Sequence, residues 1–207
     1  ARLLKREGGL ILGDVVGLGK TIMATALAKI FDEDFGYDAL IICPKNLTTM
    51  WEQYKNDYRL RAKIVSLSRV GTDLKDLRRY QLVIIDESHN LRNSQGQRYQ
   101  AIKDYIEQNE SKCLLLSATP YNKSYEDLAG QLGLFLKDDQ DLGLRPERLL
   151  TTMGETNFLH KHNISPNTLA AFRKSEYPED WQDLMRRFMI RRTRSFIKDN
   201  YAKTDPK

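Results

Sequence analysis

The sequence predicts an α/β domain in which a mostly parallel sheet is covered by helices on both faces, followed by a helical appendage. Four short apolar runs indicate strands: Leu10–Leu12, Ala39–Cys43, Leu82–Ile85 and Cys113–Leu116. Each run is apolar throughout, without alternation of polar and apolar residues, which is typical of parallel strands buried on both faces. Helical patterns separate the runs, and this alternation favours a doubly wound sheet with right-handed crossovers.

The helical patterns are recognised by the spacing of their apolar residues. They cover residues 21–31, 48–58 and 98–108, and each lies between two predicted strands. A weaker fifth strand is expected at residues 63–67. These assignments give every predicted strand a helix that returns the chain to the start of the next one.

The pattern changes after about residue 136, where a polar stretch is broken by Gly and Pro. We expect residues 1–136 to form the α/β lobe and residues 137–207 to form the appendage. One helix is predicted to start near Ser165 or Pro166 and a longer one at Pro178. The longer helix has one apolar face at helical spacing, made by Trp181, Leu184, Met185 and Phe188.

The composition limits the possible partners and compartment of the protein but does not by itself identify its function. The chain has 33 Lys and Arg against 28 Asp and Glu, a net charge of +5 that permits a polyanionic partner. Its two cysteines, Cys43 and Cys113, stand in apolar runs, so we expect buried thiols in a reducing, cytoplasmic compartment. No run approaches the roughly 18 apolar residues of a membrane span, and the first residues lack a signal-peptide core. The sequence begins abruptly, as if cut from a longer protein.

A phosphate-binding loop is predicted between the first strand and the first long helix. It reads Gly17-Leu18-Gly19-Lys20-Thr21. The glycines let backbone N–H groups approach phosphate oxygens, and the helix points its positive end at the same anion. Lys20 suits the β- and γ-phosphates, and the hydroxyl of Thr21 suits Mg²⁺.

A carboxylate pair, Asp86 and Glu87, ends the strand LVII. Ligands of open α/β sheets lie outside the carboxyl ends of the strands, so the pair should face the same crevice as Lys20. Asp86 is suited to hold Mg²⁺ through water, and Glu87 to orient and deprotonate an attacking water.

A third motif, Ser117-Ala118-Thr119, ends the strand CLLL. Its short hydroxyl side chains are placed to bond the carboxylate loop and to pass on the state of a γ-phosphate. Ser88 and His89, which follow the carboxylate pair, are expected to take part in the same coupling.

The strings DVVGLGKT, DESH and SAT, in this order, resemble motifs I, II and III of superfamily-two helicases. GLGKT with DESHNLRN is most similar to the Swi/Snf family of double-stranded-DNA translocases, in particular its compact bacterial members. ICPKNLTTMWEQY resembles motif Ia, and FMIRRTR resembles the segment near the end of the family's first lobe. The resemblance implies a RecA-like P-loop NTPase lobe that uses ATP and Mg²⁺.

The sequence also departs from the family. Asp14 stands at the first Gly position of the general phosphate-loop pattern, and Val15 replaces the usual Glu of motif I. No match is found for the upstream Gln segment or for the second RecA-like lobe with its arginine fingers. Because such an arginine contributes about 10³ to 10⁵ in rate, we expect this chain alone to bind nucleotide weakly and to hydrolyse it negligibly.

The resemblance also indicates where nucleic acid would be contacted. By position in motif Ia and the next loop, the candidates are Pro44, Lys45, Asn46, Ser68 and Arg69. Small polar groups and backbone donors suit non-specific contact with phosphates.

Other conspicuous residues have less specific interpretations. The arginines at 186, 187, 191, 192 and 194 would spread around a helix, and the resemblance favours packing and a hinge between lobes over a DNA patch. His160 and His162 are expected in a surface loop and not as metal ligands. Trp51 and Trp181 are expected in the core.

Three functions remain open from the sequence. The first is the motor lobe of an ATP-driven translocase on double-stranded DNA, of prokaryotic type. The second is the motor lobe of a restriction-type or strand-separating helicase. The third, of another class, is a nucleotide-gated interaction module that does not hydrolyse ATP.

Overall fold

The computed structural model describes residues 1–13, 19–91, 93–120 and 125–191. These residues form a six-stranded sheet in the order β3-β2-β4-β5-β1-β6, and all of its neighbouring strands run parallel. The prediction of a parallel α/β sheet is confirmed. The strands are β1 (Gly9–Leu12), β2 (Ala39–Cys43), β3 (Ala62–Ser66), β4 (Leu82–Ile85), β5 (Lys112–Leu116) and β6 (Met189–Ile190).

Helices cover both faces of this sheet because alternate residues of each strand point to opposite sides. Ile41 and Ile84 belong to one apolar cluster, which the residues of α1, α2 and α3 complete. Ile42 and Ile85 belong to the other, which contains residues of α5, α6 and α10. Buried apolar side chains on both faces explain why the strands read as continuous apolar runs.

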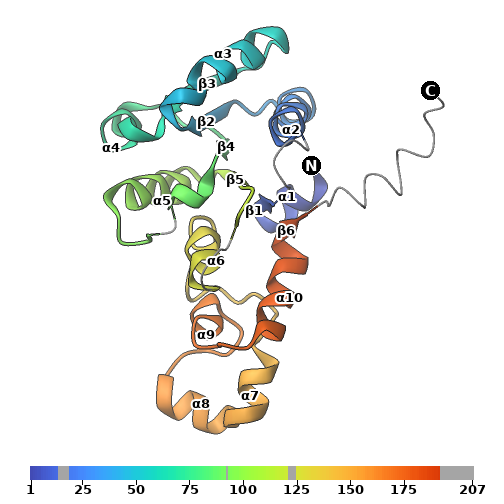
Figure 1. Cartoon of the computed structure of the whole chain (residues 1–207), viewed down its shortest axis with the longest axis vertical. Helices are drawn as coiled ribbons and strands as arrows, with labels where there is room; N and C mark the ends of the chain where they lie inside the picture. Colours follow the sequence, from blue (N-terminus) through green and yellow to red (C-terminus); the bar gives the residue numbers. More distant parts are fainter. Residues whose placement is uncertain (14–18, 92, 121–124, 192–207) are drawn as a thin grey trace, which may run out of the picture.

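The helices surround the sheet and continue beyond it at one end (Figure 1). In Figure 1, α3 lies at one end of the long axis and α7 and α8 lie at the other. None of the helices in the described ranges is both long and apolar enough to cross a membrane. Their bounds are α1 (Arg2–Glu7), α2 (Lys20–Phe35), α3 (Thr48–Asp57), α4 (Val70–Asp73), α5 (Gln97–Asn109), α6 (Tyr125–Leu132), α7 (Glu147–Met153), α8 (Glu155–His162), α9 (Leu169–Phe172) and α10 (Pro178–Phe188).

Several boundaries agree closely with the prediction. Helices α2, α3 and α5 occupy the three predicted segments, and β3 forms where the weaker fifth strand was expected. Helix α10 begins at Pro178 and buries Trp181, Leu184 and Phe188 on one face. Pro at the first helical position suits this start, since its missing N–H would have no partner in the helix.

The region after residue 136 differs from the expectation. Helices α7 and α8 form at positions for which no individual helix was predicted, and the helix expected near Ser165 is reduced to the four residues of α9. His160 and His162 therefore lie on a helix and not in a loop. The ring of His162 packs 5.0 Å from that of Phe158, and no metal-binding group of His, Cys, Asp or Glu side chains occurs in the described part of the chain.

The chain also returns to the sheet after α10. Met189 and Ile190 form β6, which pairs with Ile11 and Leu12 of β1, so the segment FMIRRTR is not one continuous helix. Leu142, Phe172 and Trp181 share an apolar cluster with strand residues. The helical region thus packs against the sheet, and the division at residue 136 stays a prediction.

Candidate nucleotide and nucleic-acid site

The candidate site lies at the carboxyl edge of the sheet. Strands β4, β5 and β1 are adjacent and parallel, with Ile85 paired to Leu115 and Leu12 paired to Leu116. The residues that follow these strands therefore meet along one edge. This edge receives the three predicted motifs from three separate parts of the sequence.

Helix α2 presents its N-terminus at this edge. Gly19 precedes it with φ 73° and ψ 36°, a left-handed conformation that glycine adopts without a steric cost. Lys20 and Thr21 are its first residues, and Gly19 at the N-cap position has no side chain to cap this turn. A helix start of this kind has backbone N–H groups and a positive dipole end available for an anion. Gly17 and Leu18 lie outside the described residues.

Asp86 follows β4 directly and is buried. Its backbone N–H donates to Ile42 O at 2.8 Å, which extends the pairing with β2 by one residue. The indole Nε1 of Trp51 donates to Asp86 Oδ2 at 2.9 Å, and the N–H of Glu87 donates to Oδ1 at 2.9 Å. The carboxylate is thus fixed in orientation by a donor on each oxygen.

Glu87 adopts a left-handed backbone conformation with φ 50°. A non-glycine residue in this region carries strain that its surroundings must offset. Here the N–H and the side-chain amide of Asn90 both donate to Glu87 O at 3.0 Å. The partly exposed carboxylate lies with Oε2 3.1 Å from His89 Nδ1, and among the described residues that nitrogen makes no hydrogen bond.

Two of the expected coupling residues, Ser88 and Ser117, are buried beside the carboxylates, whereas His89 and Ala118 are partly buried and Thr119 is exposed. Ser88 opens the 3₁₀ turn Ser88–Leu91 and donates from Oγ to Gln131 Oε1 at 2.7 Å. Ser117 Oγ accepts from the N–H of Thr119 at 3.2 Å, a bond within its own loop. Gln131 donates from Nε2 to the backbone oxygen of Pro120. A hydrogen-bonded connection between the two motifs therefore runs through Gln131.

The candidate nucleic-acid residues lie at the ends of two neighbouring strands. Pro44 and the 3₁₀ turn Lys45–Leu47 follow β2, while the turn Leu67–Arg69 follows β3. Cys43 pairs with Ser66 at these strand ends, which places the two turns beside each other. Lys45, Asn46, Ser68 and Arg69 are exposed, and Arg69 pairs with Asp73 at 3.2 Å.

Burial at the end of β2 affects the thiol of Cys43. Burial, and then the negative charges of Asp86 and Glu52, raise the pKa of Cys43 to about 12. The thiol is therefore neutral at physiological pH and acts as a small apolar group. The expectation of buried cysteines is confirmed for both Cys43 and Cys113.

The arginines near residue 190 have separate roles. Arg187 donates from Nε to Glu7 Oε2 at 2.8 Å, and it also contacts the backbone oxygen of Leu142. Burial alone would raise the pKa of Glu7, but its contacts with Arg6 and Arg187 hold it below the usual value. Arg186 is exposed and pairs with Asp183. Arg187 thus has a packing role, while Arg192 and Arg194 lie outside the described residues.

Two polar contacts at this edge were not predicted from the sequence. Trp51 was expected in the core; it is buried there, and its N–H also binds Asp86. Gln131 was not singled out at all. The sequence feature that could have pointed to Gln131 is its position. A Gln between Leu128 and Leu132 falls on the apolar face of a helix and needs hydrogen-bond partners there.

Comparison with known proteins identifies the family. The model of the SNF2-related domain matches residues 58–205, and the chain therefore belongs to this family. The Sulfolobus solfataricus SWI2/SNF2 ATPase core in complex with dsDNA superposes with a TM-score of 0.63 over 97% of this chain and 42% of that one, at 20% identity. The fold is thus that of the SWI2/SNF2 ATPase core, which is RecA-like.

Curated relatives agree with this assignment. A Bacillus subtilis protein named uncharacterized ATP-dependent helicase YqhH is 29% identical over 150 residues, covering 63% of this chain and 26% of the relative. The killer plasmid pGKL-2 helicase of Kluyveromyces lactis, also named uncharacterized, is 32% identical over 139 residues, covering 58% of this chain and 22% of the relative. The chain thus spans about a quarter of the length of these relatives.

Proposed function

We propose that this chain is the ATP-binding lobe of a DNA-dependent ATPase that moves along double-stranded DNA. The observation that supports this most strongly is the meeting of three motifs at one sheet edge. Lys20 begins α2, the pair Asp86 and Glu87 follows β4, and Ser117 follows β5. In parallel α/β sheets this edge is where ligands bind.

The residues at this edge fit a magnesium nucleotide. Helix α2 begins after Gly19 and has the positive end of its dipole at Lys20, and the buried carboxylate of Asp86 is a hard oxygen ligand of the kind that Mg²⁺ prefers. Lys20 would hold the β- and γ-phosphates together with the loop at Gly17–Gly19, and Thr21 and Asp86 would hold the ion. Bound Mg²⁺ neutralises charge on the phosphates. Glu87 would orient a water and accept its proton.

Duplex DNA is the proposed partner. The exposed turns after β2 and β3 lie side by side and offer Lys45, Asn46, Ser68 and Arg69 together with backbone N–H groups. Such groups suit contact with phosphates without reading bases. A protein of the same fold has been solved in complex with dsDNA, which supports the choice of a duplex.

A second RecA-like lobe of the same polypeptide would complete the site. Phosphoryl transfer needs charge stabilisation on the side of the γ-phosphate that faces away from Lys20, and an arginine supplies it in related motors. We propose that the chain alone binds nucleotide weakly and turns it over negligibly. Brisk, DNA-stimulated hydrolysis by this chain alone would contradict that.

The test is the ATPase rate of the complete polypeptide without nucleic acid, with single-stranded DNA and with double-stranded DNA. We expect strong stimulation by the duplex, and Glu87→Gln to lower kcat by about 10²- to 10⁴-fold because it removes the base. Glu33→Gln makes the same chemical change on the exposed face of α2 and should leave kcat unchanged.

The other outcomes point to the alternatives. Stimulation mainly by single strands, with unwinding of a tailed duplex, would favour a strand-separating helicase. ATP binding without stimulation by either form of DNA would favour a nucleotide-gated module, and the proposal of a DNA motor would be withdrawn.

A further inference from the structure

Gln131 of α6 lies between the loop after β4 and the loop after β5. Its side chain is fully buried. Oε1 accepts from Ser88 Oγ at 2.7 Å, while Nε2 donates to the backbone oxygens of Pro120 and, at 3.3 Å, Asp127. One amide thus joins the residue after Glu87 to the residue after Thr119.

The orientation of this amide follows from its partners. The backbone oxygens of Pro120 and Asp127 can only accept, so the NH₂ group must face them. The carbonyl oxygen then faces Ser88, whose hydroxyl donates. Flipping the amide would place a carbonyl oxygen against two other carbonyl oxygens, and the arrangement is therefore fixed.

We infer that Gln131 is a positioning residue that links the carboxylate loop to the loop after β5, and so relays the state of the nucleotide to α6. This inference rests on the proposed function. A buried amide that loses its partners incurs a penalty comparable to a lost hydrogen bond or more. A shift of Ser88 must therefore be followed by Gln131, and with it by Pro120, or the amide is left unpaired.

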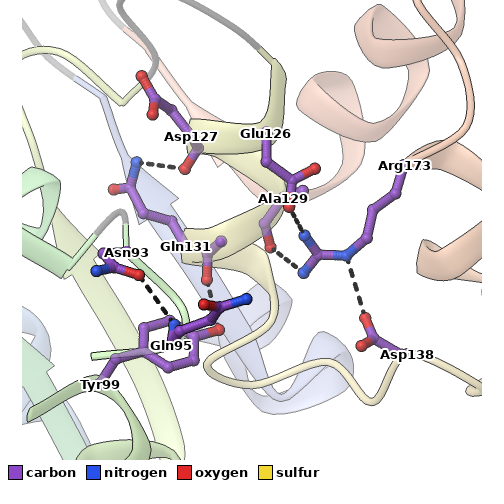
Figure 2. A network of polar contacts seen from close by, with 10 residues as sticks. Asn93, Gln95, Tyr99, Glu126, Asp127, Ala129, Gln131, Asp138 and Arg173 are labelled. Atoms are coloured by element: carbon purple, nitrogen blue, oxygen red, sulfur yellow. Dashed lines mark hydrogen bonds and ion pairs between the residues drawn. The ribbon is translucent and has the colours of Figure 1, made fainter. Parts of the chain in front are cut away.

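Helix α6 can pass such a shift to the helical region. Arg173, which follows α9, donates from Nη2 to Ala129 O at 3.2 Å and also contacts Glu126. Figure 2 shows Arg173 holding α6 from one side, with Gln131 on the other. The rings of Tyr125 and Trp181 stack at 5.3 Å, which ties the start of α6 to α10. Helix α6 therefore lies between the carboxylate loop, which Gln131 contacts, and the helical region, which Ala129 and Tyr125 contact.

The test is Gln131→Met in the complete polypeptide. Met preserves the length and flexibility of the side chain but removes all three polar contacts, to Ser88, Pro120 and Asp127. We expect the stimulation of kcat by duplex DNA to fall roughly five- to tenfold, in the range of typical coupling between sites. The KM for ATP should change less than about twofold, because the phosphate contacts belong to the loop before α2.

Ser88→Ala tests the same link from its other end. It should lower the stimulation by a similar factor, and the double variant should be no worse than either single variant, because both changes break one connection. If the double variant instead lost stimulation by the product of the two single-variant factors, the inference would be overturned.

Two controls separate positioning from stability. Leu132→Val shortens the neighbouring buried residue of α6, and Gln108→Met repeats the substitution at an exposed position of α5. Both should retain the wild-type stimulation, although Leu132→Val lowers the melting temperature. Unchanged stimulation in Gln131→Met, or an equal loss in Leu132→Val, would overturn the inference. Wild-type protein without DNA stimulation would instead overturn the proposed function, and the link with it.

Discussion

At the residue scale, the orientation of Asp86 depends on a side chain far away in the sequence. Trp51 lies 35 positions earlier and reaches the carboxylate from α3, the helix that follows the candidate nucleic-acid turn. A hydrogen bond to an ionised carboxylate is stronger than one between neutral groups. Trp51 therefore connects the position of α3 to a carboxylate suited to hold Mg²⁺.

Trp51→Phe should raise the Mg²⁺ concentration that the ATPase requires. Phe fills much of the same space but leaves Asp86 Oδ2 without its indole donor. Residues that orient a metal ligand typically contribute 10- to 100-fold in metal affinity, and since Mg²⁺ is held partly by the nucleotide we expect roughly a fivefold rise in the Mg²⁺ concentration for half-maximal rate. A magnesium titration at saturating ATP measures it.

Trp181→Phe is the matched control. Trp181 is equally buried and also donates from Nε1, to Ser175 O at 2.9 Å, but it lies in the helical region. Both variants should lose stability through the lost hydrogen bond and the small cavity. Only Trp51→Phe should change the magnesium requirement, and equal requirements in the two variants would refute the assigned role of Trp51.

At the element scale, β1 is held against the segment after α6 by a close approach at Gly9. A Cβ at this position would come within 2.1 Å of the ring of Phe135. The same ring packs 6.1 Å from that of Phe188 on α10. Glycine at position 9 thus lets one aromatic ring bridge the central sheet and the last helix.

Gly9→Ala should therefore destabilise the fold. Phe135 must move away from the new methyl group, and overpacking of this kind typically costs about 1–3 kcal/mol. Gly71→Ala is the control, because its Cβ would meet no described atom within 4 Å and Ala favours the helix α4 by roughly 0.5–1 kcal/mol. In urea unfolding, only Gly9→Ala should lower the midpoint concentration of urea. A midpoint unchanged by Gly9→Ala would contradict the close packing.

The elements that could be predicted from the sequence are those with a local pattern. Strands β2 and β4 are apolar at every position because both faces are buried, and α10 has one apolar face at helical spacing. Strand β6 has two residues, too few to show a period, and it forms because its partner β1 is already in place. Helices α7 and α8 are short and are separated by Gly154, so neither shows a sustained apolar face.

The candidate site divides in the same way. The residues expected to contact phosphate and Mg²⁺ stand in contiguous motifs whose spacing is visible in the chain. Trp51 and Gln131 act through hydrogen bonds to residues 35 and 43 positions away, and no local pattern encodes such a pairing. A buried polar side chain on an apolar helical face shows that partners exist, but only the fold shows which.

At the scale of the whole molecule, the two ends of the described chain are joined. Glu7 of α1 binds Arg187 of α10, 180 positions away, and β6 lies beside β1 in the sheet. Gly13, the last described residue before the phosphate-binding loop, donates its N–H to Ile190 O at 2.8 Å. Strand β6 therefore holds the last described segment of the chain beside the residue that precedes the phosphate-binding loop.

The interior as a whole should make the fold sensitive to alkaline pH. Burial raises the pKa of the Cys43 thiol to about 12, and it also raises the pKa values of Cys113 and Tyr105. It does the same for Tyr99, although the charge of Arg173 partly offsets the effect. Each of these groups must stay protonated in the folded state. An unfolded thiol, in contrast, loses its proton at about pH 8.5.

The sign of the effect follows from these differences. Below about pH 8.5 both states hold the thiol protons, so their contribution to stability is fully present. Above it the unfolded state releases them while the folded state does not, and each thiol lowers the free energy of unfolding by about 1.4 kcal/mol per pH unit. Urea unfolding between pH 7.5 and 10 should show this decline. The double variant Cys43→Ala, Cys113→Ala should be less stable at pH 7.5 but show a shallower decline. An equal decline in the two proteins would mean that groups other than the thiols determine the alkaline limit.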